Sequence, residues 1–181
     1  GRRGKDCVVH PTAVVEGCWL GDGVQVGALA VVRGCVLADG VTIEPLAMVE
    51  ASILSAGSRV QRQALVKYSV LSERASVAGS IQLSVLGVEA TVKHSALLLD
   101  QSLASQGVRV QVGDSLEDAP LGMAGCCVGD RTFIGAQVAV APGRALPPDL
   151  QIVPAPESVL SHISEDLKGA CAVRNGRLEP L

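Results

Sequence analysis

Aromatic residues are nearly absent from this sequence. One Trp, one Tyr and one Phe occur in 181 residues, whereas an ordinary globular core gains much of its buried surface from aromatic rings. No apolar run approaches the length of a membrane span, and no signal peptide is visible. The core must therefore be narrow and aliphatic, and we expect a cytoplasmic protein with no membrane partner.

An excess of charge of either sign is also missing. The net charge is −3, and acidic and basic residues are interspersed, so the electrostatics give no reason to expect a nucleic acid partner. The six cysteines contain no Cys-x-x-Cys pair, and we interpret them as reduced structural thiols. Neither they nor the three histidines have the spacing of a metal site, so none is predicted.

The sequence contains a short repeat of aliphatic residues. Between residues 20 and 86, single aliphatic residues recur at steps of six, six and five. An amphipathic helix would instead place apolar residues at i, i+3, i+4 and i+7, and a half-buried strand would alternate every second residue. The period is typical of a parallel β-helix in which three short sides close one coil. Stacked coils then give three inward ladders: Leu20, Leu37, Leu54, Leu71 and Leu86; Val26, Ile43, Val60, Val77 and Val92; and Val32, Val49, Val66, Ile81 and Leu98.

The residue four places after each inward aliphatic is small or β-branched, as at Val24, Ala30 and Val41. In this pattern the sequence resembles the hexapeptide-repeat proteins over residues 8–153. The resemblance implies an all-β fold, a single-stranded left-handed parallel β-helix of triangular cross-section with about 8–9 coils. The hand is implied by the resemblance alone, because parallel crossovers are right-handed in most proteins.

Three parts are expected along the chain. Residues 1–7 are a linker or a remnant, and because the chain opens on Gly1 rather than Met we expect a processed or cut piece. Residues 8–153 form the β-helix. Residues 154–181 form a C-terminal α-helix, which the apolar spacing places over 157–168, followed by a short hairpin-like tail.

An external loop near 113–125 is expected to interrupt the β-helix. Just before it, Val108 and Val110 are predicted to add one more strand to the coils. Long loops on a rigid scaffold often carry function, so Asp114, Glu117 and Asp118 are candidate binding residues. An acidic loop without a ligand is the competing interpretation.

Three functions are compatible with the resemblance. The repeated Ser-Val-Leu side, as in Ser69-Val70-Leu71, is similar to β-helix domains attached to sugar-phosphate nucleotidyltransferases. The first interpretation is therefore an assembly or regulatory module, with a possible upstream catalytic domain and no required cofactor. The alternative is an O- or N-acyltransferase acting on a sugar or amino-sugar with acetyl-CoA or another acyl-CoA. A pure scaffold is the third, so whether the chain is an enzyme stays open.

His94 is the candidate catalytic residue under the alternative. In acyltransferases of this family a His acts as general base toward the acceptor, a role that suits a pKa near neutrality. His94 lies on an outward corner of the predicted coils, whereas His10 belongs to the first coil and His162 to the C-terminal helix. The residues around His94 match no acyltransferase motif, and a solvated corner His is the competing interpretation.

Two outer faces of the rod are predicted to differ. The residues before the third ladder form an apolar stripe that includes Val31, Met48, Leu65 and Leu97. The residues before the second ladder are polar: Gln25, Thr42, Arg59, Ser76, Thr91 and Arg109. Exposed apolar stripes usually mark an interface, so we expect a homo-oligomer, a trimer before a dimer, with Met48 and Leu65 near the contact centre. Just after the third ladder, Arg33, Glu50 and Lys67 should stack as an exposed charge ladder.

Overall fold

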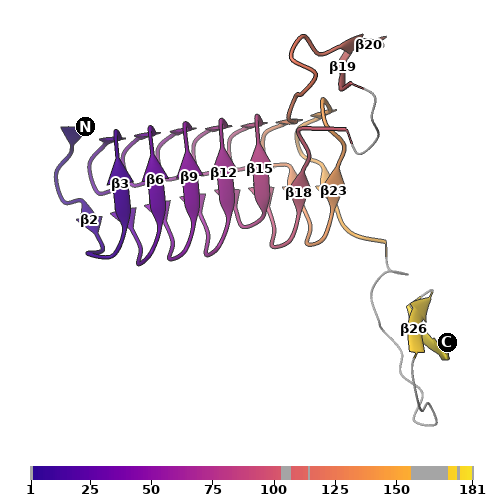
Figure 1. The fold of residues 1–181 in the computed structure, drawn as a ribbon, viewed down its shortest axis with the longest axis horizontal. Helices are drawn as coiled ribbons and strands as arrows, with labels where there is room; N and C mark the ends of the chain where they lie inside the picture. Colours follow the sequence, from indigo (N-terminus) through magenta and orange to yellow (C-terminus); the bar gives the residue numbers. More distant parts are fainter. Residues whose placement is uncertain (1, 103–106, 114, 156–170, 175, 181) are drawn as a thin grey trace.

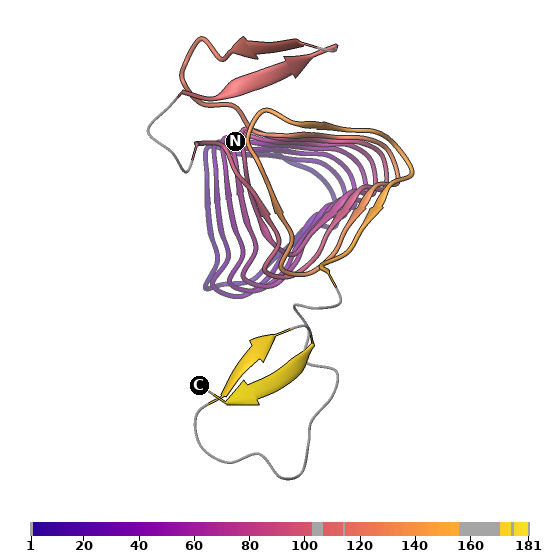
Figure 2. The ribbon, with the colours of Figure 1, turned by 90° about the vertical axis from the view of Figure 1, so that its right-hand side faces the viewer.

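The computed structural model describes residues 2–102, 107–113, 115–155, 171–174 and 176–180. Within these ranges the chain winds into a rod of stacked coils (Figure 1), and each coil is a triangle in cross-section (Figure 2). Three parallel sheets run along the rod, one on each side of the triangle. The predicted fold class, a left-handed parallel β-helix, is confirmed for the described residues.

Each coil gives one short strand to each sheet, except that the last described coil gives none to sheet 3. Sheet 1 contains β1 (Arg2–Arg3), β4 (Trp19–Leu20), β7 (Val36–Leu37), β10 (Ile53–Leu54), β13 (Val70–Leu71), β16 (Val85–Leu86), β21 (Cys127–Val128) and β24 (Ala145–Leu146). Sheet 2 contains β2 (Val8–Val9), β5 (Gln25–Val26), β8 (Thr42–Ile43), β11 (Arg59–Val60), β14 (Ser76–Val77), β17 (Thr91–Val92), β22 (Phe133–Ile134) and β25 (Gln151–Ile152). Sheet 3 contains β3 (Val14–Glu16), β6 (Val31–Arg33), β9 (Met48–Glu50), β12 (Leu65–Lys67), β15 (Ser80–Gln82), β18 (Leu97–Leu98) and β23 (Ala139–Val140).

The three inward ladders fill the rod as predicted. In sheet 1, Leu37, Leu54 and Leu71 pair in register from coil to coil, and each is at most 1% exposed. Because such an aliphatic side chain contributes about 1.5–3 kcal/mol when fully buried, the ladders stabilise a rod that has no room for rings. The ladders continue past the interruption through Val128, Ile134 and Val140.

The corners turn through residues with positive φ. Between sheets 3 and 1, φ is 44° at Ala51 and 48° at Tyr68, a conformation that costs an L-residue roughly 1–2 kcal/mol. In the first coils Gly17 and Gly34 occupy the same corner without that penalty. The side chain of Tyr68 points out of this corner and is 60% exposed, as the narrow core predicts.

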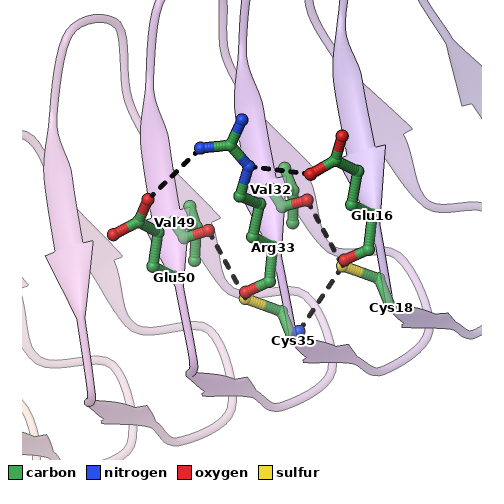
Figure 3. Close-up of polar contacts among 7 residues, drawn as sticks. All are labelled: Glu16, Cys18, Val32, Arg33, Cys35, Val49 and Glu50. Carbon is green, nitrogen blue, oxygen red and sulfur yellow. Dashed lines mark hydrogen bonds and ion pairs between the residues drawn. The ribbon is translucent and has the colours of Figure 1, made fainter.

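A buried column of thiols and hydroxyls lines the inside of this corner: Cys18, Cys35, Ser52, Ser69, Ser84 and Cys126. From Cys18 to Ser84, each thiol or hydroxyl donates to the carbonyl two residues before it. The Cys126 thiol instead donates to the Ala141 carbonyl of the next coil at 3.3 Å. The Ser52 hydroxyl donates to the Glu50 carbonyl at 2.7 Å, and the Ser69 N–H donates to the Ser52 Oγ at 3.1 Å. Cys18 and Cys35 repeat these contacts (Figure 3), with the Cys35 N–H donating to the Cys18 Sγ at 3.4 Å.

Two thiols of this column, Cys35 and Cys126, are structural. Desolvation by burial raises the pKa of the Cys35 thiol to about 11, and burial does the same to the Cys126 thiol. Thiols with pKa values this high stay protonated at neutral pH and are poor nucleophiles and metal ligands.

The charge ladder outside the same corner is confirmed. Arg33 lies between two acidic residues of neighbouring coils, with its Nε 2.9 Å from the Glu16 Oε2 (Figure 3). The Lys67 Nζ lies 3.0 Å from the Glu50 Oε2. These pairs are worth only about 0–1 kcal/mol each because they are partly exposed.

The interruption of the β-helix differs in part from the prediction. After β18 the chain leaves the rod, and it returns at β21, where Cys127 pairs with Val85. Between them, β19 (Arg109–Val112) and β20 (Ser115–Asp118) pair antiparallel outside the rod (Figure 1).

The extra solenoid strand predicted through Val108 and Val110 is therefore wrong. Val110 pairs with Glu117 in the hairpin, and Phe133 rather than Arg109 continues the outward positions of sheet 2. The alternation of Val108 and Val110 suits pairing with a strand of the rod or with β20. Pairing with β20 closes a much shorter loop than stacking on the rod does.

The two ends of the chain add short strands. β1 lies in the predicted linker 1–7 and pairs with β4 in sheet 1. β26 (Cys171–Arg174) and β27 (Arg177–Pro180) form the predicted hairpin, whereas the predicted helix over 157–168 lies outside the described residues. In the described ranges, no helix has the length and apolar character needed to span a membrane.

Candidate functional site

One coil is two residues shorter than its neighbours at the corner between sheets 2 and 3. The step from Val77 to Ile81 is four residues, whereas the same corner takes six residues in the coils before and after. Both ends still stack in register, since Val77 pairs with Val60 and Ile81 pairs with Val66. The two residues are therefore lost from the corner between Val77 and Ile81, and the surface of the rod is recessed at this corner.

Ala78 and Gly79 form the buried floor of this recess. A Cβ on Gly79 would lie 2.2 Å from the Ala96 carbonyl oxygen, so only glycine fits the shortened corner. The Ala78 N–H donates to the Val92 carbonyl at 2.7 Å, and the Gly79 carbonyl accepts from the Leu65 N–H at 3.1 Å. The floor is thus held by the ordinary hydrogen bonds between coils.

The walls come from the corners of the adjacent coils. Arg62 and Gln63 form one wall, and His94 and Ser95 form the other, with Ser80 also lining the recess. The recess is open to solvent and has a volume of about 250 Å³, slightly below the range of about 300–1,000 Å³ that is usual for small-molecule sites. The recess can therefore hold the reacting end of a ligand while the rest lies on the surface.

The side chains of His94 and Arg62 are available to bind a ligand. Among the described residues, the His94 imidazole has no hydrogen-bond partner and the Arg62 guanidinium has no ion pair; both residues are exposed. The nearby Arg59, in contrast, lies 3.6 Å from the Glu44 carboxylate. An available imidazole can accept a proton, and an available guanidinium can bind a phosphate or carboxylate.

The predicted loop residues lie elsewhere. Glu117 and Asp118 are exposed on β20, opposite Val110 and Arg109, and neither lines the recess. Asp114 lies outside the described residues. A binding role for these three acidic residues stays a prediction.

The predicted interface stripe is present on sheet 3. Val31, Met48 and Leu65 are stacked in register and half-buried, and Leu97 is 41% exposed. Ser80 interrupts the stripe between Leu65 and Leu97, where a shallow depression of about 110 Å³ opens. The stripe is outward and apolar as expected, and its role as an interface stays a prediction.

Sequence reasoning missed two features. Arg62 was not predicted as a site residue, because it lines the recess only once the shortened corner is stacked between the adjacent coils. The four-residue step from Val77 to Ile81 was the sequence signal for this corner. The outward positions of sheet 1 are also apolar, from Trp19 through Ile53 to Val85. The signal was simple, since an apolar residue precedes almost every inward residue of the first ladder.

No family model matches the sequence, and no curated protein is significantly similar to it. A variant of perosamine N-acetyltransferase from Caulobacter crescentus, solved with CoA and GDP-perosamine, is 21% identical, with 82% of this chain and 53% of that chain covered and a TM-score of 0.37. The acetyltransferase domain of PglB from Neisseria gonorrhoeae, solved with acetyl coenzyme A, is 21% identical, with 82% and 52% covered and a TM-score of 0.30. The polysialic acid O-acetyltransferase OatWY is 11% identical, with 91% and 75% covered and a TM-score of 0.26.

The chain spans about half the length of the first two of these structures. All three are acetyltransferases, and none is a nucleotidyltransferase. Identities and TM-scores this low do not transfer a function, a ligand or a family to this chain. The described part of this chain is a β-helix with a recessed corner, lined by an imidazole and a guanidinium that have no partner among the described residues.

Proposed function

We propose that the chain is an acyl-CoA-dependent acyltransferase that uses the recess beside His94. The observation that carries the proposal is that His94 and Arg62 line opposite walls of one recess, each with a basic side chain that has no partner among the described residues. The sequence resemblance to hexapeptide-repeat proteins supports it, because acyltransferases of that family use a His as general base. The acyl-transfer alternative is thus preferred to the nucleotidyltransferase-associated module.

The proposed reaction needs a base and an anion site. The hydroxyl or amine of a sugar or amino-sugar attacks the thioester carbonyl of the acyl-CoA while His94 accepts the proton of the attacking group. The carbon–sulfur bond breaks, the acyl group stays on the acceptor, and the proton passes from His94 to the departing CoA sulfur. Arg62, on the opposite wall, binds a phosphate of the acyl-CoA.

The test is an assay of thiol release from acetyl-CoA with a panel of amino-sugars and sugars. Loss of a general base typically costs about 10²–10⁴-fold, so His94→Ala should lose at least about 100-fold in kcat. His10→Ala is the matched control, because His10 lies in the first coil and bonds to the Thr12 hydroxyl at 2.9 Å. Arg62→Ala should mainly raise the KM for acetyl-CoA.

Two results would contradict acyl transfer. One is a wild-type protein that releases no thiol with any acceptor and shows no thermal shift with any acyl-CoA. The other is a measurable activity that His94→Ala leaves intact.

An assembly or regulatory module is the second candidate, and the apolar stripe of sheet 3 favours it. A homo-oligomer, a trimer before a dimer, or an upstream catalytic domain would then cover Met48 and Leu65. Leu65→Glu should yield smaller species in light scattering, while Thr42→Glu on sheet 2 should not. A wild-type protein that is monomeric at high concentration would contradict self-association through this stripe.

A further inference from the structure

A second hollow adjoins the recess on the outer face of sheet 3. It is the depression of about 110 Å³ beside Leu65 and Leu97, and Ser80 lines both this depression and the recess. Ser80 pairs with Leu65 on one side and with Leu97 on the other, on the neighbouring strands β12, β15 and β18 (Figure 1). The small side chain of Ser80 therefore leaves a gap between two larger ones. A ligand that enters the recess can extend across β15 into this gap.

The far end of the depression contains a carboxylate. Gln82 and Asp100 both line it, and the Gln82 Nε2 donates to the Asp100 Oδ2 at 2.6 Å. Gln82 follows Ser80 by two residues, so this end lies roughly 7 Å along the strand from the recess. Among the described residues Asp100 forms no ion pair, whereas Lys67, beside Gln82, is paired with Glu50. Because an ionised carboxylate has about four acceptor positions, Asp100 can accept further hydrogen bonds.

The two hollows together have opposite charges at their ends. His94 and Arg62 line the recess, Asp100 lines the far end of the depression, and Leu65 and Leu97 lie between. An apolar lining with a few polar groups is usual for small-molecule sites. A sugar ring suits this arrangement, because its C–H groups can pack against the leucines and its hydroxyls can donate to the carboxylate. An acidic sugar does not suit it, because like charges would be brought together in a partly buried site.

We propose that the depression binds the acceptor sugar of the acyl transfer, and that this acceptor carries no acidic group. The inference rests on the proposed function and narrows its substrate class. Asp100 accepts hydrogen bonds from two neighbouring hydroxyls of the ring, and the reacting hydroxyl or amine at the opposite edge lies at His94. The acyl-CoA phosphate stays at Arg62, at the basic end. Gln82 is a positioning residue, since its amide holds the Asp100 carboxylate.

Asp100→Asn is the variant that isolates the carboxylate. Asn keeps an oxygen that can accept from the Gln82 amide, so the rod should fold as before, which a thermal melt checks. The variant loses the charge and one of the two acceptor oxygens. Glu117→Gln is the matched control, because Glu117 is exposed on β20 and lines neither hollow.

Sugar binding is measured first, by ligand-observed NMR titration of the full chain without acyl-CoA. The probes are the methyl glycosides of glucose, glucosamine and glucuronic acid. The wild type should bind the first two, and the glucuronide at least about 10-fold more weakly. Asp100→Asn should weaken binding of the first two by at least about 10-fold, because hydrogen bonds to charged groups are the stronger ones. A wild type that binds neither of the first two, or that binds the glucuronide equally well, would overturn the subsite.

Kinetics then separate the subsite from acyl transfer itself. With an acceptor that supports thiol release from acetyl-CoA, Asp100→Asn should raise the KM for the acceptor by at least about 10-fold and leave the KM for acetyl-CoA unchanged. An unchanged KM for the acceptor would overturn the subsite while acyl transfer stands. Sugar binding that depends on Asp100 in a protein that releases no thiol would have the opposite meaning, since it would support the sugar site and contradict acyl transfer.

Discussion

The interior and the exterior of this rod follow different rules. Inside, every coil repeats the same classes of residue, with aliphatics in three ladders and small side chains at the corners. Outside, the outward residues of sheet 1 are apolar from β4 to β24, those of sheet 2 are polar from β5 to β17, and sheet 3 combines an apolar stripe with ion pairs. Because each coil must stack on a neighbour of the same cross-section, the repeat constrains the interior. The exterior is free of that constraint and is where function can differ from coil to coil.

The largest effect on stability is expected in β10, where one residue points into the rod and its neighbour points to solvent. Leu54 is 0% exposed in the first ladder, whereas its neighbour Ile53 is 52% exposed on the outside. Leu54→Ala should lower the free energy of unfolding by about 2–5 kcal/mol, because it leaves a cavity. Ile53→Ala should change it by less than about 1 kcal/mol. Urea denaturation at low protein concentration measures both, and equal losses would mean that the strand is oriented differently.

The interior could be predicted from sequence because its rule is local and repeated. A step of six, six and five residues places Leu54 over Leu37, and no other information is needed for the register. The hand of the coils came from the resemblance, because the same spacing fits either hand. The inward position of Cys35 could also be predicted from the sequence, since Ser52 and Ser69 occupy the same point of later coils.

The candidate site could be predicted only in part. His94 was recognisable as a corner histidine, but Arg62 lies 32 positions away in sequence and joins it only across the shortened coil. The hairpin of β19 and β20 was missed for a different reason, because the alternation of Val108 and Val110 does not specify which strand they pair with. The repeat does relate Arg62 to His94, since each lies two residues after an inward valine of the second ladder, but it does not show that the shortened corner between them leaves a recess. The hairpin, in contrast, joins segments that the repeat does not relate.

The next largest effect is expected at the floor of the recess. Gly79→Ala would bring a Cβ to 2.2 Å from the Ala96 carbonyl oxygen, and relief of this contact requires the backbone to shift. Overpacking of this kind typically costs about 1–3 kcal/mol, which thermal unfolding would detect. Ser80→Ala, an outward change in the next residue, is the control. If Gly79→Ala is as stable as the control, the shortened corner is less tightly packed than its geometry requires.

A smaller loss is expected in the hydroxyl column. Ser69→Ala removes the acceptor of the Ser84 N–H, which now lies 3.1 Å from the Ser69 Oγ. A buried N–H without a partner should cost about 1–2 kcal/mol. Ser69→Cys should recover most of this loss, because at the start of the column the Cys18 Sγ already accepts the Cys35 N–H in the same way. A cysteine variant as unstable as the alanine variant would show that the column depends on oxygen rather than on a shared geometry.

A second buried serine should respond in the opposite direction. Ser58 is 0% exposed, and its hydroxyl has no hydrogen-bond partner among the described residues. Its neighbours in the same corner of adjacent coils are Val41 and Ala75, so a methyl group suits the position. Ser58→Ala should therefore raise the free energy of unfolding by about 1 kcal/mol. A loss of stability would reveal that the Ser58 hydroxyl is satisfied in solution.

The smallest effect is expected on the outside, at a corner between sheets 1 and 2. Arg131 donates two hydrogen bonds to Asp149, at 2.6 and 2.8 Å, and these bonds lower the pKa of the Asp149 carboxyl. Because the folded pKa lies below the unfolded value of about 3.9, the pair stabilises the fold fully above that pH. The stabilisation is lost as the pH falls through the folded pKa.

Asp149→Asn is the matching variant, since Asn tolerates the φ of 60° at this position. At pH 7 its Tm should be slightly below that of the wild type, and the difference should shrink in high salt, because both side chains are exposed and screened. The two Tm values should converge as the pH is lowered well below about 4, where Asp149 is protonated in both states. A difference that persists in acid would mean that Asp149 acts through packing rather than through its charge.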